Sequence, residues 1–138
     1  MKAFTPLEDA VLRKLLEGGR QWLSVLRAQF NVAQVSSREH TGTGFYTDFS
    51  VPHEAPALPN EPSFRFGDVS AEINDLLYGA GFLVVVKDGY LDYLEGYSYE
   101  EPWPENIHAF HVYYSNSKDR DEDELEKNIS YDPSSLRL

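Results

Sequence analysis

Apolar side chains in the first thirty residues follow the spacing that predicts two short helices. In the first helix, the positions that share one face are Leu7, Val11, Leu12, Leu15 and Leu16. Thr5 and Glu8 fit a capping box with Pro6 at the first helical position, and Gly18-Gly19 ends the helix. A second helix is predicted over about residues 20–30, and its apolar side consists of Trp22, Leu23, Val25, Leu26 and Phe30.

From about residue 32 the apolar period changes toward two, which indicates an antiparallel sheet. Residues 32–40 and 44–51 are predicted to form a hairpin around the turn at residues 41–43. The proline-rich residues 52–62 lack amide donors that a central strand needs, so they are expected to form a surface loop or an edge crossing.

The clearest pattern is a second hairpin, in which two apolar strands meet at Asp88-Gly89. With Lys87 opposite Tyr90, the predicted pairs are Val86 with Leu91, Val85 with Asp92, Val84 with Tyr93, Leu83 with Leu94 and Phe82 with Glu95. The face expected to meet the helices holds Phe82, Val84, Val86, Leu91 and Tyr93. The other face, expected to be partly exposed, holds Lys87, Tyr90, Asp92, Leu83, Val85 and Leu94.

These elements and a last strand at about residues 108–114 predict an α+β fold. Two N-terminal helices are expected to pack on an antiparallel sheet of about five strands. Residues 1–115 are expected to form this single domain, and residues 116–138 a loose, polar, acidic tail whose composition also allows a short helix around residues 120–128.

The net charge of −11 is confined to the second part of the 138-residue chain. Residues 1–60 carry six Lys/Arg and six Asp/Glu, whereas residues 61–138 carry six and seventeen. Such a surface repels nucleic acid and anionic membrane, and it attracts a basic protein or simply keeps the molecule soluble. The chain also has no cysteine, no long apolar run and no secretory signal pattern, so a cytoplasmic location is expected.

No sequence motif for metal binding, phosphate binding or catalysis is complete. Asp119, Asp121 and Asp123 have the spacing of a calcium loop, but Glu124 and Ser130 stand where that loop needs Gly and a bidentate Glu. The glycines at residues 41–44 suit a hairpin turn better than a phosphate loop, and the four histidines show no convergent spacing. We therefore predict no metal, no cofactor and no catalytic residue, and we do not expect an enzyme.

The stretch "LEGYSYEEPWPE", residues 94–105, is the strongest candidate for a binding surface. Tyrosine and tryptophan offer large contact area with few rotatable bonds, proline makes a loop rigid, and carboxylates select a basic partner. The candidate partner-binding residues are Tyr90, Asp92, Glu95, Tyr97, Tyr99, Glu100, Glu101, Trp103 and Glu105. The alternative is structural: Gly96 marks a bend in the strand, and Trp103 caps the core.

The stretches "TGTGFYTDF", "KDGYLDYLEGYSY" and "EPWP", within about residues 38–104, resemble a group of small bacterial proteins of unassigned activity. In size, acidity and aromatic content the chain is also similar to the immunity proteins with which bacteria neutralise toxins.

The leading prediction is an acidic binding or inhibitor protein, immunity-like, that engages a basic protein. A small-molecule-binding domain or minor enzyme, with a pocket between helices and sheet, is the first alternative. A subunit of a homo-oligomer, such as a homodimer, is the second.

Overall fold

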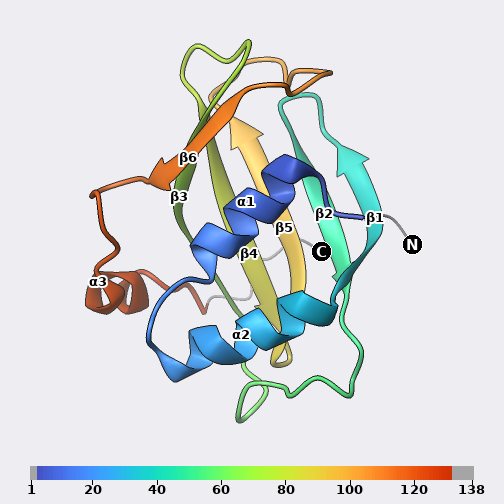
Figure 1. Cartoon of the computed structure of the whole chain (residues 1–138), viewed down its shortest axis with the longest axis vertical. Coiled ribbons are helices and arrows are strands. Elements are labelled where there is room, and N and C mark those ends of the chain that lie inside the picture. Colours follow the sequence, from blue (N-terminus) through green and yellow to red (C-terminus); the bar gives the residue numbers. More distant parts are fainter. Residues whose placement is uncertain (1–2, 132–138) are drawn as a thin grey trace.

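The computed structural model describes residues 3–131 and consists of two layers (Figure 1). In chain order its elements are α1 (Pro6–Leu15), α2 (Gln21–Val32), β1 (Gln34–His40), β2 (Gly44–Ser50), β3 (Phe64–Ile73), β4 (Ala80–Lys87), β5 (Tyr90–Ser98), β6 (Phe110–Tyr114) and α3 (Glu122–Lys127). The strands form one antiparallel sheet in the order β1-β2-β5-β4-β3-β6, and α1 and α2 lie across one face of it. The predicted α+β class and helix packing are confirmed, with six strands in place of about five.

Local signals in the sequence account for α1. Thr5 and Glu8 form the predicted capping box, in which the Glu8 N–H donates to the Thr5 hydroxyl and the Thr5 N–H donates to the Glu8 carboxylate. The helix ends at Leu15, and Gly18 takes a φ of 135°, a value that side chains rarely allow. The apolar face of α1 is buried in the core.

The core lies between the two helices and one side of the sheet. Its members include Val11, Leu12, Leu15, Leu23, Leu26, Phe45, Phe66, Phe82, Val84, Val86, Leu91 and Leu94. Strand residues that alternate with these, such as Tyr46, Tyr93 and Glu95, lie on the other side, which we call the helix-free face.

Strand β3, which the sequence pattern did not predict, pairs with both β4 and β6. Its inward residues are Phe64, Phe66, Val69, Ala71 and Ile73. A bulge between Phe66 and Val69 inserts an extra residue, so the apolar period of two breaks in the middle of the strand. Neither half alone is long enough to stand out as a strand.

The predicted register of the β4–β5 hairpin is correct only next to the turn. Lys87 pairs with Tyr90 and Val86 with Leu91, but a bulge at Asp92 then shifts every further pair by one residue. The structure pairs Val85 with Tyr93, Val84 with Leu94, Leu83 with Glu95 and Phe82 with Gly96. As a result Tyr93 lies on the helix-free face and Leu94 in the core, the reverse of the prediction.

The polar segment after β6 is attached to the domain as far as Tyr131. Arg120 donates two hydrogen bonds to the Asp68 carboxylate, at 2.9 and 2.6 Å. The short helix expected near residues 120–128 is present as α3, and its Leu125 is buried. Ser130 exchanges two backbone hydrogen bonds with Arg65 of β3. The remaining residues of the expected tail, 132–138, lie outside the described part of the chain.

Candidate binding surface

The nine predicted partner-binding residues do not form one surface. Tyr90 and Asp92 lie at the β4–β5 turn, at the opposite end of β5 from the others. The Tyr90 ring stacks on His53 with 5.4 Å between centroids, and its hydroxyl donates to the Ala55 carbonyl oxygen at 3.1 Å. Tyr90 therefore holds the proline-rich loop against the sheet.

Glu95, Tyr97 and Tyr99 share the helix-free face near the other end of β5. The Tyr97 ring lies over Gly81, where a Cβ would be 2.5 Å from the tyrosine hydroxyl oxygen. Burial of its ring, together with the nearby Tyr99 and Glu95, raises the pKa of Tyr97. The rings of Tyr97 and Tyr99 meet edge to face at 5.9 Å, and Tyr99 is 50% exposed.

Trp103 lies on the helix side of the sheet, as the structural alternative expects. Its ring meets Phe45 edge to face at 5.3 Å, and its backbone N–H donates to the Gly42 carbonyl oxygen at 2.8 Å. The exposed Glu105 follows it along the same loop. Both are thus separated from Tyr97 and Tyr99 by the thickness of the sheet.

Glu101 has a structural role that its sequence neighbourhood does not indicate. Its carboxylate accepts hydrogen bonds from the backbone N–H groups of Leu77, at 2.8 Å, and Tyr78, at 3.0 Å. These residues belong to the β3–β4 turn, more than twenty positions earlier in the chain. Glu100, beside it, stays exposed with a φ of 67°.

A second anchor holds the other side of the β3–β4 turn. The Asn74 side chain donates to the Asn106 carbonyl oxygen at 2.9 Å and accepts from the N–H groups of His108 and Ala109 at 2.9 and 3.2 Å. Because Asn74 and Glu101 make hydrogen bonds on the two sides of the turn, the backbone of the turn is held against the segment after β5. Its exposed side chains are therefore presented in a defined position.

The turn presents two of the most exposed large apolar side chains of the described chain. Leu77 is 79% exposed and Tyr78 is 66% exposed. Ala80 pairs with Ser98, so the turn and Tyr99 continue from neighbouring strands at the same end of the sheet. We call Leu77, Tyr78, Tyr97, Tyr99 and Glu100 the aromatic tip.

Three residues of the aromatic tip were among the predicted partner-binding residues, whereas Leu77 and Tyr78 were not. One signal pointed to them: the stretch "NDLLYG" places three apolar residues between turn-forming Asn, Asp and Gly. Apolar residues in a turn have no core to enter unless the turn folds inward.

The surroundings of the aromatic tip are acidic. Residues 71–80 and 98–102 contain no Lys or Arg, and their carboxylates are Glu72, Asp75, Glu100 and Glu101. The cation that acts on the tip is Arg65 of β3, which opposes the rise in the pKa of Tyr97. A cationic surface is therefore the electrostatically favoured neighbour.

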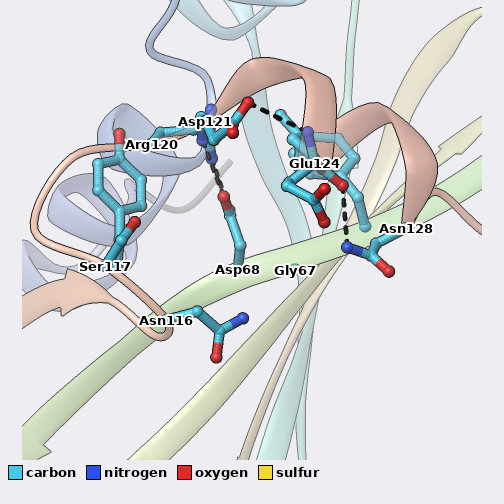
Figure 2. A pocket seen from close by; sticks show the side chains of 11 residues that line it. Gly67, Asp68, Asn116, Ser117, Arg120, Asp121, Glu124 and Asn128 are labelled. Atoms are coloured by element: carbon cyan, nitrogen blue, oxygen red, sulfur yellow. Dashed lines mark hydrogen bonds and ion pairs between the residues drawn. The ribbon is translucent and has the colours of Figure 1, made fainter.

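Of the cavities within residues 3–131, two bear on the predicted chemistry, and neither is lined by a residue of the aromatic tip. The first, about 300 Å³, separates β3 from α3, and Figure 2 shows Asp68 on its β3 wall pointing toward Arg120. Its polar groups largely bind each other: Asn128 donates to the Glu124 carbonyl oxygen at 2.9 Å, and Asp121 caps α3. The calcium-like spacing around Asp121 thus serves the helix start.

The second cavity, about 380 Å³, lies between the start of α1, the sheet and the segment after Trp103. Its apolar wall includes Leu7, Phe45, Trp103, Ile107 and Phe110, and its polar lining includes Glu8, Arg38, His40 and Glu105. This is the place where the alternative prediction put a small-molecule pocket.

Within residues 3–131, no group of three or more His, Asp or Glu side chains is arranged to hold a metal ion. None of the helices in this range has the length and apolar content needed to cross a membrane. In comparisons with protein-family models, curated proteins and solved structures, nothing matches the chain significantly. The resemblances noted in the sequence therefore stay predictions.

Proposed function

We propose that this protein is an acidic binding domain that engages a basic protein partner through the aromatic tip. The observation that carries the proposal is the β3–β4 turn, where Leu77 and Tyr78 are 79% and 66% exposed on a backbone fixed by Glu101. Apolar side chains on a rigid support lose little conformational entropy on binding, as is typical of interface hot spots.

The charge around the tip indicates the kind of partner. Four carboxylates and no Lys or Arg occupy residues 71–80 and 98–102, and they outnumber the nearby Arg65, so a cationic protein surface would be drawn toward the apolar residues. The same field disfavours nucleic acid and anionic membrane. An inhibitor of a basic toxin in the bacterial cytoplasm, as the likeness to immunity proteins implies, is one form of this function.

The test places a photo-crosslinking amino acid at Tyr78 and, as the control, at Val32, which is 49% exposed at the end of α2. Irradiation in cells that make the protein should give an adduct with a basic protein from position 78 and not from position 32. Glu100→Lys should weaken the adduct, because it reverses a charge of the tip without touching the Glu101 contacts.

Salt dependence completes this test. The adduct, reformed from purified components, should fade between about 0.01 M and 1 M salt, as the Debye length falls from about 30 Å to about 3 Å. Identical adducts from both positions, or an adduct that ignores both salt and Glu100→Lys, would refute the proposal.

The second cavity supports a second candidate function, the binding of a small amphipathic molecule. Its size of about 380 Å³ and its largely apolar wall with a few polar groups are typical of ligand sites. Trp103 lines this cavity, and the chain has two tryptophans, so a Trp22→Phe variant would report ligand entry by Trp103 fluorescence. A ligand found by thermal shift that leaves this fluorescence unchanged would exclude the cavity.

A further inference from the structure

The two edges of the sheet differ in how well they are protected against pairing. At β1, a bulge after Val35 interrupts the ladder, and Arg38 and Glu39 carry charges. At β6 the sequence "FHVYY" has no charged residue, no proline and high strand propensity. Natural sheets usually blunt an edge with bulges and charges, so β6 is the edge left open to another strand.

The hydrogen-bond pattern shows which groups of β6 point outward. The N–H of Asn74 donates to the Ala109 carbonyl oxygen at 3.0 Å, and the N–H of Ser115 donates to the Asp68 carbonyl oxygen at 2.8 Å. In an antiparallel ladder, every second residue faces the neighbouring strand, so His111 and Tyr113 also bond to β3. The residues between them direct their N–H and C=O groups away from β3: Phe110, Val112 and Tyr114.

No strand of the described residues lies beyond β6, which forms one margin of the sheet in Figure 1. Tyr113 and Phe110 are 37% and 36% exposed there. Three residues with outward backbone groups therefore stand unpaired along an uncharged strand.

We propose that β6 pairs antiparallel with β6 of a second copy of this chain, around a two-fold axis at Val112. This register places Val112 opposite Val112 of the second copy, Phe110 opposite Tyr114, and His111 opposite Tyr113. All three outward residues then form hydrogen-bonded pairs, and the two sheets join into one. The pairing is closed, because each β6 edge is used once and the β1 edges stay outside.

Self-complementarity favours a second copy over an unrelated strand. When two identical strands pair antiparallel around a two-fold axis, the residues whose N–H and C=O groups point outward on one strand lie opposite the same kind of residue on the other. The pairs Phe110 with Tyr114 and Val112 with Val112 are aromatic and β-branched, the types that stabilise antiparallel ladders. No like charges meet within the strand itself.

Salt separates this inference from the proposed function, on which it does not depend. Each copy carries a net charge of −11, so dimerisation should strengthen as salt screens the repulsion. Binding of a basic partner at the aromatic tip should weaken under the same change. Failure of one leaves the other testable.

Sedimentation equilibrium of the purified full chain at about 1 M salt tests the pairing, with Val112→Pro as the variant and Val112→Thr as its control. Proline removes only an outward N–H and keeps the bonds to β3, so the monomer should remain folded by circular dichroism. We expect a concentration-dependent dimer for the wild type and Val112→Thr, and at least about tenfold weaker association for Val112→Pro. Equal association of all three, a wild type that stays monomeric, or growth beyond dimers would overturn the proposal.

A cysteine crosslink tests the register independently, because the chain contains no other cysteine. Hydrogen-bonded pairs place Cα atoms about 5.5 Å apart, within the range of a disulfide. Val112→Cys should therefore form a disulfide dimer on oxidation. His111→Cys alone should not, whereas His111→Cys mixed with Tyr113→Cys should form the mixed dimer. A dimer from His111→Cys but not from Val112→Cys would contradict the register.

Discussion

The buried ion pair between α1 and β1 gives a sharp test of how the helix layer is held on the sheet. Glu8 is 2% exposed, and its carboxylate accepts two hydrogen bonds from the Arg38 guanidinium, at 2.8 and 2.7 Å. It also accepts from the Thr47 hydroxyl at 2.5 Å and the Thr5 N–H at 2.8 Å. Burial alone would raise the pKa of Glu8, but these hydrogen bonds outweigh it, so that pKa is lowered.

The perturbation is Arg38→Met, which leaves the buried carboxylate without its cation. At a charge separation of about 4 Å and an effective dielectric constant of about 20, the lost attraction is about 4 kcal/mol. Removal of one partner of a buried pair typically costs about 3–5 kcal/mol. We therefore expect the free energy of unfolding to fall by about 3–4 kcal/mol at pH 7, and Tm by about 10 °C.

The double variant Glu8→Gln/Arg38→Met isolates the charge effect. Glutamine keeps the capping box and the contact to Thr47 but carries no charge, so the double variant should regain about 2 kcal/mol relative to Arg38→Met. Urea unfolding followed by circular dichroism measures both. A double variant as unstable as Arg38→Met would refute the reasoning, because the cost would then come from lost packing.

The pH dependence has opposite signs in the two backgrounds. In the wild type the folded pKa of Glu8 lies below its ordinary value of 4.5, so its contribution is complete above that value and is lost as the pH falls through the folded pKa. In Arg38→Met the cation that lowers the pKa of Glu8 is missing, so the effect of burial dominates and the pKa of Glu8 is expected to rise. The difference in the free energy of unfolding between the wild type and Arg38→Met should then become smaller as the pH falls from 7 toward 4.5. A deficit that stays constant over this range would contradict the assignment.

Three further predictions follow from single contacts. Glu101→Ala should speed amide hydrogen exchange at the two turn residues that Glu101 binds by about tenfold, equivalent to about 1.4 kcal/mol. Exchange rates measured by NMR that stay unchanged would contradict the role of Glu101 in holding the turn. Gly44→Ala, whose Cβ would lie 2.1 Å from a backbone oxygen, should cost about 3 kcal/mol in urea unfolding, against about 1 kcal/mol for Gly42→Ala in open space. Arg120→Lys should lower the free energy of unfolding by about 2 kcal/mol, because lysine cannot reproduce the two hydrogen bonds to Asp68. The segment around residue 120 should then be cleaved faster by protease, and cleavage at the wild-type rate would count against this role of Arg120.

Sequence patterns predicted the elements whose signals are local. The capping box at Thr5 and Glu8 needs only four neighbouring residues, and both were placed correctly. The hairpin at Asp88-Gly89 likewise follows from its turn. In both cases the information lies within one turn of the chain, so no tertiary contact was needed to find them.

Bulges account for the errors in the sheet. One extra residue after Phe66 hid β3, and one at Asp92 reversed the faces of Tyr93 and Leu94. Tyr93 and Leu94 are both large and largely apolar, so either register of the β4–β5 hairpin buries a suitable side chain. Periodicity alone therefore cannot distinguish the two registers. The pairing with β2 on the other side of β5 settles the choice in the folded protein.

The candidate site was predicted only in part because its support comes from distant residues. Glu101 was assigned to partner binding, whereas it clamps a turn more than twenty positions away. That contact exists only because β5 and β4 are neighbours in the sheet, which brings the segment after β5 beside the turn before β4. No spacing along the chain encodes such a bond.

The acidic charge of this protein acts differently on its two exposed surfaces. Carboxylates outnumber cations around the aromatic tip, so the proposed attraction for a basic partner should be largest at low salt. The neutral strand β6 meets its copy only against the repulsion between two chains of net charge −11. Partner binding neutralises part of that charge and should therefore promote pairing of β6 at low salt. A basic partner that binds the tip and leaves the protein monomeric would show that the two surfaces are electrostatically independent.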